Sequence, residues 1–276
     1  VDSSDLPLNV SREILQNNRQ VDIIKNSVTK KIIDTFEEMK ESEYDDYLKI
    51  YKEFGRVLKE GIHFDFSRRE TIADLLLFAT TESEEGKFRT LKEYVADMKE
   101  GQEEIYYIVG SSLADAANSP YLEAFRQNGF EVIFMTDDID DFIFNGFEYK
   151  GKKFHSITRG DITLDKEKTG QIEETRKKYE KLIDLIKTTL SEDVKDVRLS
   201  GRLTDTVCCL VADEGDLDPT MERLLKAMGQ EVPAIKRILE LNPTHPLFAA
   251  MNRAFEKDAR SDELKEYIRL LYDQAL

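Results

Sequence analysis

The spacing of apolar residues changes along the chain, and this change constrains the fold more than any other feature of the sequence. Over residues 21–79, apolar side chains recur at every third or fourth position, which is typical of amphipathic helices. Residues 105–109 and 131–135 are instead short runs rich in β-formers, separated by a helical stretch. We therefore expect a helical layer followed by a strand–helix–strand unit with parallel strands.

Glycine and proline refine these elements. Gly61 is expected to end the second helix, which begins near Tyr44. Pro120 suits the first turn of the helix between the two strands, and Gly129 suits its end. A hairpin is expected around Gly151.

The second half of the chain predicts an α+β arrangement. Residues 158–175 are charged and almost free of large apolar side chains, so we place a domain boundary there, giving domains 1–157 and 158–276. Beyond it we expect a helix at 179–190, strands at 194–199, 206–212 and 238–241, and helices after Pro219, Pro246 and Ser261. The predicted fold class is thus α/β and α+β: a helical layer and a βαβ unit, then a short sheet with helices.

Charge excludes two classes of partner. The 56 acidic and 40 basic side chains give 276 residues a net charge of −16, whereas nucleic acids and anionic membranes need clustered positive charge. No apolar run approaches the roughly 20 residues of a membrane span.

The adjacent Cys208 and Cys209 lie in an apolar run, where cysteines act as small hydrophobic residues, and a reducing compartment fits them.

Candidate chemical sites within the chain are weak. Gly110-Ser-Ser112 follows a strand and resembles a phosphate cradle, but no complete glycine-rich nucleotide motif accompanies it, so a plain strand-to-helix turn is the better interpretation. Three separated histidines, His63, His155 and His245, form no metal or triad motif and are expected to be surface or capping residues. We expect no metal site.

The N-terminal run places one cation in an unusual position. Pro7 disfavours a helix before it, so a helix is expected to begin near Val10. Arg12 then lies in the first turn, where the helix dipole favours anions, and Gln16 lies on the same face. A solvated arginine is the ordinary interpretation, whereas a guanidinium held there for a phosphate is the functional one.

The run Asp5-Leu-Pro-Leu-Asn-Val-Ser-Arg-Glu-Ile-Leu-Gln16 resembles the signature of the heat shock protein 90 chaperone family, in particular its bacterial HtpG-type members. Further motifs follow in family order: Lys59-Glu-Gly61, Ile105-Tyr-Tyr-Ile108, Ser119-Pro120 with Glu131-Val132, Asp140-Asp141, Asp196-Val-Arg-Leu199, Arg202-Leu-Thr-Asp205, Met221-Glu-Arg-Leu-Leu-Lys-Ala227 and Glu240-Leu-Asn-Pro243. The resemblance therefore covers essentially the whole chain.

This resemblance implies a fragment of an ATPase chaperone: the later middle domain and most of the C-terminal domain. It implies that Arg12 reaches the γ-phosphate of ATP on a separate N-terminal nucleotide domain, and that Gln16 contacts that domain. The parent protein would use ATP and Mg, assist client folding in the cytoplasm during stress, and form a homodimer. For this fragment alone we expect no bound cofactor, no activity and weak dimerisation, because the terminal helices are incomplete.

A second implied site is an amphipathic helix for client proteins. Met221, Leu224, Leu225 and Met228 share one face, at spacings of three and four residues. Such a stripe is more often core, but the matching family segment contacts clients. The alternative for the whole chain is a passive acidic scaffold that binds partner proteins and has no role in ATP hydrolysis.

Overall fold

The computed structural model describes residues 19–162, 164, 166–217, 222, 225, 226, 229, 230 and 235–276. It divides the chain into two compact units, residues 1–77 and 78–276. The described part of the first unit is helical, as the apolar spacing predicts. The second unit contains two separate sheets with their helices.

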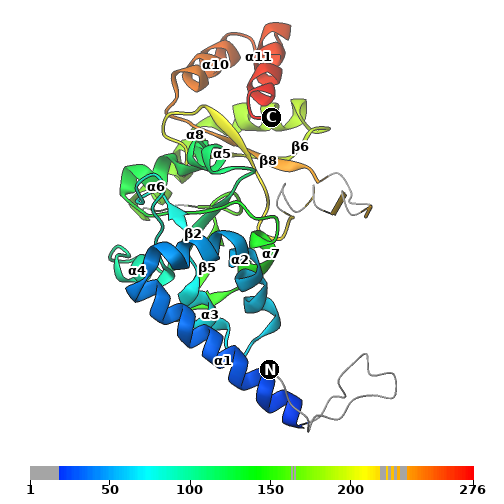
Figure 1. Ribbon diagram of the computed structural model, residues 1–276. Helices are drawn as coiled ribbons and strands as arrows, with labels where there is room; N and C mark the ends of the chain where they lie inside the picture. Colours follow the sequence, from blue (N-terminus) through cyan, green and yellow to red (C-terminus); the bar gives the residue numbers. More distant parts are fainter. Residues whose placement is uncertain are drawn as a thin grey trace. The chain divides into compact units, whose positions relative to one another are not determined.

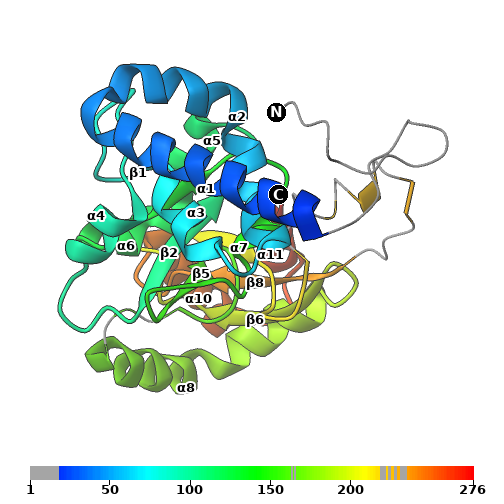
Figure 2. The same ribbon diagram turned by 60° about the horizontal axis from the view of Figure 1, so that its bottom comes forward.

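The first unit contains α1 (Arg19–Ser42), α2 (Tyr44–Phe64) and α3 (Arg69–Leu75), which lie side by side (Figures 1 and 2). The buried Tyr47 of α2 fixes α3, because its hydroxyl donates to the Leu75 carbonyl at 2.5 Å. One prediction is wrong: Gly61 does not end α2, which continues to Phe64. A Cβ on Gly61 would lie 3.2 Å from Ile72 Cδ1, so this glycine permits a close helix contact.

The first sheet of the second unit has the strand order β1-β3-β2-β5-β4. Its strands are β1 (Ala79–Thr80), β2 (Glu104–Val109), β3 (Ile133–Met135), β4 (Glu148–Tyr149) and β5 (Lys152–Ser156). The predicted strand–helix–strand unit is confirmed, because β2 runs parallel to β3. The helical segments here are α4 (Leu91–Ala96), α5 (Leu113–Ala117), the 3-10 turn η1 (Pro120–Leu122), α6 (Glu123–Asn128) and α7 (Asp140–Phe144).

Proline and glycine residues mark the turns that connect the elements of this sheet. Pro120 begins η1 after Ser119, whose hydroxyl accepts from the Tyr121 N–H. Gly129 ends α6 in the left-handed region at φ +66°, as predicted. The predicted hairpin is also present: β4 and β5 are antiparallel, and Lys150 and Gly151 both have positive φ.

The second sheet has the order β6-β8-β7. It contains β6 (Val194–Leu199), β7 (Cys208–Val211) and β8 (Arg237–Leu241), and it packs with α8 (Lys166–Thr189), α10 (Pro246–Lys257) and α11 (Asp262–Asp273). The central strand β8 is parallel to β6 and antiparallel to β7. The strands and the helices after Pro246 and Ser261 are therefore as predicted, and the fold class is confirmed.

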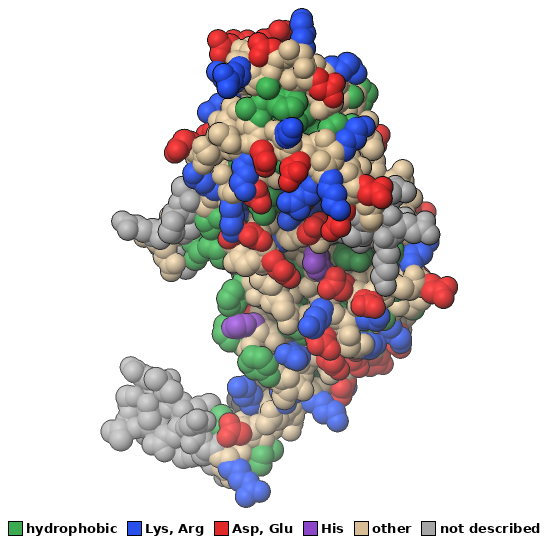
Figure 3. All heavy atoms as spheres, turned by 180° about the vertical axis from the view of Figure 1, so that it is seen from behind, with side chains coloured by type: hydrophobic (Ala, Val, Ile, Leu, Met, Phe, Trp, Pro, Cys, Tyr) green, Lys and Arg blue, Asp and Glu red, His purple; other side chains and the backbone are tan. Residues whose placement is uncertain are grey.

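Three further observations concern the charge distribution, the apolar character of the helices and the potential metal ligands. On the face that Figure 3 shows, basic side chains are interspersed with acidic ones rather than gathered in one patch. Among the described residues, no helix combines the length and the apolar character that crossing a bilayer requires. Within the same residues, no cluster of three or more potential metal ligands occurs.

Candidate functional site

Most of the residues predicted to carry function lie outside the described part of the chain. These are Arg12 and Gln16 of the N-terminal run, and Met221, Leu224 and Met228 of the apolar stripe. Leu225 is described and half-buried, and its carbonyl accepts from the Gln230 N–H at 3.0 Å. Their proposed roles therefore stay predictions.

The structure points instead to the contact between the two sheets of the second unit. We call this contact the sheet joint; it comprises η1 and α6, the connection 157–160, and the loop 200–206 with its partners on β6, β7 and β8. Its residues come from segments far apart in the sequence. The joint is where polar and charged side chains are buried together.

Glu123, the first residue of α6, holds the loop 204–206. Its carboxylate accepts from the N–H groups of Thr204 at 2.7 Å and Asp205 at 2.8 Å. The Thr206 N–H lies 3.0 Å from the second oxygen, and the Thr206 hydroxyl also donates to that oxygen. One carboxylate thus satisfies four donors of a loop more than 80 residues away.

Two more bonds attach the same helical segment to the second sheet. The Tyr121 hydroxyl donates to the Leu210 carbonyl on β7. The Ala124 N–H donates to the Arg202 carbonyl at 3.1 Å. Because these donors surround Glu123 in the sequence, η1 and α6 attach to the second sheet at three successive points.

The hydrogen bonds from the loop lower the pKa of Glu123. Burial alone would raise the pKa of this carboxyl, but the Thr206 hydroxyl and the backbone N–H groups of residues 204–206 outweigh that effect. The pKa of Glu123 therefore lies below its ordinary value. At neutral pH the loop holds a carboxylate anion.

A buried ion cluster lies at the centre of the joint. The side chain of Arg202 is 0% exposed and that of Glu240 is 1% exposed, and Arg202 Nε lies 2.9 Å from Glu240 Oε2. Register places Arg198 opposite Glu240 on the neighbouring parallel strand, and Arg198 Nη2 lies 2.7 Å from Glu240 Oε1. The Ser200 hydroxyl donates to Glu240 Oε2 at 2.7 Å. Glu240 therefore accepts from three side chains.

The cluster contains two guanidinium groups and one carboxylate, so its positive charge needs further acceptors. Arg202 donates to the carbonyls of Ile157 and Gly160, and Arg198 also donates to Gly160. These carbonyls belong to the connection between the sheets. The buried Arg202 and the partly exposed Arg198 therefore bind the second sheet to that connection. Removing a partner from such a buried network is costly.

Backbone bonds join the connection 157–160 to both sheets. The Ile157 N–H donates to the Tyr107 carbonyl on β2 at 2.9 Å. The Gly160 N–H donates to the Ala212 carbonyl, and the Ala212 N–H donates to the Thr158 carbonyl. The residues beside the predicted boundary are therefore buried and paired, whereas a mobile linker would expose them. The two-domain division at 157/158 stays a prediction.

A second buried ion pair joins the connection 157–160 to α7, which follows β3 of the first sheet. Arg159 donates to the Asp141 carboxylate of α7, and both side chains are less than one-tenth exposed. The Tyr107 hydroxyl donates to the other Asp141 oxygen at 3.1 Å. Arg159 and Asp141 anchor the connection to the first sheet, as Arg202 anchors it to the second.

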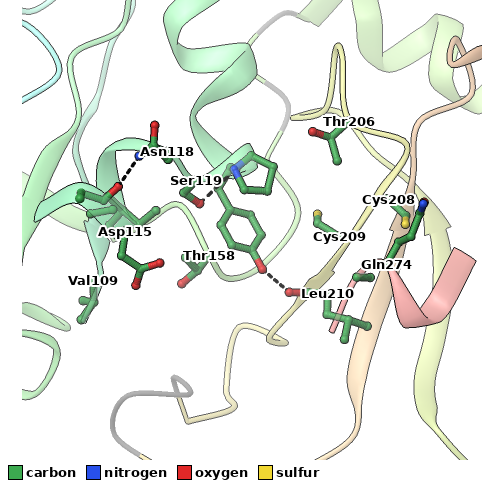
Figure 4. Close-up of a pocket in the computed structure, with 17 residues that line it drawn as sticks. Val109, Asp115, Asn118, Ser119, Thr158, Thr206, Cys208, Cys209, Leu210 and Gln274 are labelled. Atoms are coloured by element: carbon green, nitrogen blue, oxygen red, sulfur yellow. Dashed lines mark hydrogen bonds between the residues drawn. The ribbon is translucent and has the colours of Figure 1, made fainter. Parts of the chain in front are cut away.

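A cavity of about 630 Å³ opens beside the joint, between the end of β2, α5, η1, β7 and the residues after α11 (Figure 4). Its polar lining consists mainly of hydroxyl, amide and thiol groups, and Asp115 is the one charged side chain among its lining residues. The Asp115 carboxylate already accepts from the Ser111 N–H and hydroxyl. The cavity lining therefore contains no pair of acid and base, and no nucleophile with a base beside it.

The two cysteines beside the cavity behave as core residues. Burial raises the pKa of Cys208 to about 11 and raises that of Cys209 well above its ordinary value. Cys208 Sγ also lies 3.1 Å from the Leu271 carbonyl. Both thiols are protonated at neutral pH and are poor nucleophiles, as the apolar sequence context predicts.

The weaker candidates have structural roles. In the turn 110–112, the Ser112 hydroxyl caps α5. Gly110 lies so close to α5 that a Cβ on it would lie only 2.9 Å from the Ala116 nitrogen. His245 caps α10 by accepting from the Leu247 N–H at 3.2 Å, which confirms the capping interpretation for this residue. His155 Nδ1 lies 3.1 Å from a Glu104 carboxylate oxygen on the neighbouring strand.

Sequence reasoning names Arg202 and Glu240 only as parts of family motifs and assigns no role to them or to Glu123. Glu123, Arg202 and Glu240 have charged side chains that any surface helix, loop or strand end could carry. A usable signal existed at Glu240, which interrupts the apolar run of β8 between Leu239 and Leu241. A charge within a buried strand requires a partner, but the sequence does not show which one.

Comparisons with known proteins cover the whole chain. The family model described as Hsp90 protein matches residues 1–276. Chaperone protein HtpG is 54% identical in Geobacter metallireducens, 53% identical in Geobacter sulfurreducens and 46% identical in Legionella pneumophila subsp. pneumophila. Each alignment covers 100% of this chain but only 43% or 44% of the relative, so the chain spans less than half the length of these relatives.

Proposed function

The chain belongs to the Hsp90 protein family, and from this premise we propose that it is the middle and C-terminal part of an ATP-dependent molecular chaperone. One observation carries the proposal: the whole chain matches chaperones named HtpG at up to 54% identity while covering 43% of their length. The remaining length of such relatives leaves room for a nucleotide domain. The activity of the whole protein then depends on how this chain acts on that domain.

Arg12 is the residue proposed to act on ATP. In this proposal its guanidinium neutralises charge on the γ-phosphate bound by the nucleotide domain, and Gln16 contacts that domain from the same helix face. ATP and Mg would bind to the nucleotide domain alone, so this chain would supply one side chain of a composite site. A planar fork of N–H donors suits this role better than a point charge does.

The sheet joint supports a mechanical part of the same proposal. A closing movement at the nucleotide domain reaches the C-terminal part only through a connection that transmits force, and buried ion pairs hold residues 157–160 to both sheets. The parent protein is proposed to be a cytoplasmic homodimer that assists client folding under stress. The joint would keep its middle and C-terminal parts aligned.

The apolar stripe Met221, Leu224, Leu225 and Met228 is proposed to contact clients. Methionine and leucine suit such a surface because they adapt to many partners. Next to this stripe in the sequence, Glu222 forms an ion pair with Arg237 of β8 at 2.5 Å.

We predict that Met221→Ser together with Leu225→Ser weakens binding of an unfolded client by about tenfold, since two apolar side chains of the proposed contact are lost. The melting temperature should change little. The measurement is fluorescence anisotropy of a labelled unfolded protein, with thermal unfolding recorded in parallel. A large fall in melting temperature would show that the stripe is core. Ile23→Ser, which alters an exposed apolar residue of α1, is the matched control.

A passive acidic scaffold is the competing function. The two functions differ in one outcome: a chaperone fragment accelerates ATP hydrolysis by its isolated nucleotide domain, whereas a scaffold does not. ATP turnover by that domain, measured with and without the added chain, tests the proposal. An unchanged rate at saturating chain concentration would favour the scaffold.

A further inference from the structure

The contact between Glu123 and the loop 204–206 has the geometry of a bound anion and its receptor. Three successive backbone N–H groups and one hydroxyl converge on two carboxylate oxygens, with N–O distances from 2.7 to 3.1 Å. Convergent N–H groups of this kind form the anion-binding concavities known as nests. The donors that the structure places on Glu123 are three backbone N–H groups and one hydroxyl, so neutral donors hold the charge.

The loop is held in shape by bonds that do not involve Glu123. On its N-terminal side, the Ser200 hydroxyl accepts from the N–H groups of Arg202 and Leu203, each at 3.1 Å. On its C-terminal side, the Asn242 side-chain amide donates to the Thr206 carbonyl at 3.0 Å. The receptor is therefore preorganised, and it should persist when its occupant is removed.

We propose that residues 204–206 form an oxyanion-binding loop, that the Glu123 carboxylate fills it as an internal ligand, and that this occupancy is a releasable latch between α6 and the second sheet. The inference does not depend on the proposed chaperone activity. A small carboxylate should occupy the same loop once Glu123 is removed. Protonation of Glu123 should also open the latch, because a neutral carboxyl accepts these bonds weakly.

Other charges around the latch do not replace the carboxylate. Asp205 is on the loop itself, and its carboxylate accepts from the Thr204 hydroxyl at 3.2 Å, while its N–H faces Glu123. Arg126 of α6 donates to the Ala117 carbonyl, and the guanidinium of Arg202 points to Glu240. The thiol of Cys209 is the other titratable group nearby, and its raised pKa keeps it neutral at neutral pH.

The pH dependence follows from the lowered pKa of Glu123. A carboxyl whose pKa is lower when folded contributes stability that is fully present above its unfolded value, near 4.3. That contribution is lost as the pH falls through the lower, folded value. The latch is therefore closed at neutral pH and opens only in acid, below the ordinary glutamate range.

Hydrogen exchange tests the latch on the 276-residue chain. In Glu123→Ala, the amides of residues 204–206 should exchange at least about tenfold faster, since each loses a charge-assisted acceptor. Sodium acetate should restore their protection, whereas sodium chloride at equal ionic strength should not. Glu93→Ala is the matched control. Glu93 lies on α4, and its carboxylate accepts a hydrogen bond from the Thr90 N–H, so its removal should leave the loop 204–206 unchanged.

Two results would overturn the inference. The amides of residues 204–206 could keep their wild-type protection in Glu123→Ala, or acetate could restore no more protection than chloride. A third measurement needs no variant: the carboxyl carbon resonance of Glu123 in the wild-type chain should titrate below the ordinary glutamate pKa. Titration at the ordinary value would also contradict the latch.

Discussion

Alanine in place of Arg12 is expected to lower ATP turnover of a full-length protein containing this chain by about a hundredfold to a thousandfold. The reason is that the guanidinium would contact phosphate oxygens whose charge changes during transfer, so its loss raises the barrier to reaction. Nucleotide affinity should be nearly unchanged, because the nucleotide domain makes the ground-state contacts. Steady-state ATP hydrolysis and nucleotide titration, measured on the same preparation, separate the two effects.

The control for this experiment is Arg19→Ala, which removes an exposed arginine at the start of α1. It should leave turnover close to the wild-type rate. Arg12→Lys keeps the charge but loses the planar fork, and it should recover only part of the activity. Wild-type turnover in Arg12→Ala would remove Arg12 from the catalytic role.

Replacing Arg202 by alanine is expected to destabilise the second unit by about 3 to 5 kcal/mol. The substitution leaves the buried Glu240 with one fewer cation and leaves the carbonyls of Ile157 and Gly160 without one of their donors. Glu240 keeps Arg198 and Ser200, and the Gly160 carbonyl keeps Arg198, but the buried carboxylate loses its fully buried cation and the Ile157 carbonyl loses its side-chain donor. Removing one partner of a buried ion pair in this way costs more than the pair itself contributes. Urea unfolding followed by circular dichroism, compared with wild type, measures the loss.

An exposed ion pair provides the matched control for Arg202. Arg269 pairs with Asp193, but their side chains are 49% and 29% exposed, so Arg269→Ala should cost at most about 1 kcal/mol. In the double variant Arg202→Met with Glu240→Leu, both partners become apolar, and part of the lost stability should return. A loss of under about 1 kcal/mol for Arg202→Ala would show that the cluster does not stabilise the joint.

Helices and turns whose ends are marked by a nearby proline or glycine could be predicted from the sequence. Pro120 and Gly129 bracket the helical segment between β2 and β3 because their backbone preferences act within a single turn. The hairpin at Gly151 has the same local origin. The prediction that Gly61 ends a helix is wrong because this glycine permits a contact with Ile72, and a glycine at a helix contact looks the same in sequence as one at a helix end.

The joint could not be predicted, because it depends on pairings between distant segments. Glu123 and Thr206 are 83 residues apart, and nothing near either residue specifies the other. Arg198 meets Glu240 only because β6 and β8 pair in a particular parallel register. The proposed role of Arg12 is inferred from a family resemblance, because the spacing of neighbouring residues does not indicate a contact with ATP.

We propose that this chain supplies Arg12 to a separate nucleotide domain. The most direct measurement adds the isolated nucleotide domain of the same protein to this chain, in wild-type and Arg12→Ala forms, and records ATP hydrolysis against chain concentration. We predict saturable stimulation by the wild-type chain and little or none by Arg12→Ala. Equal stimulation by both forms, or no stimulation by either, would contradict the claim.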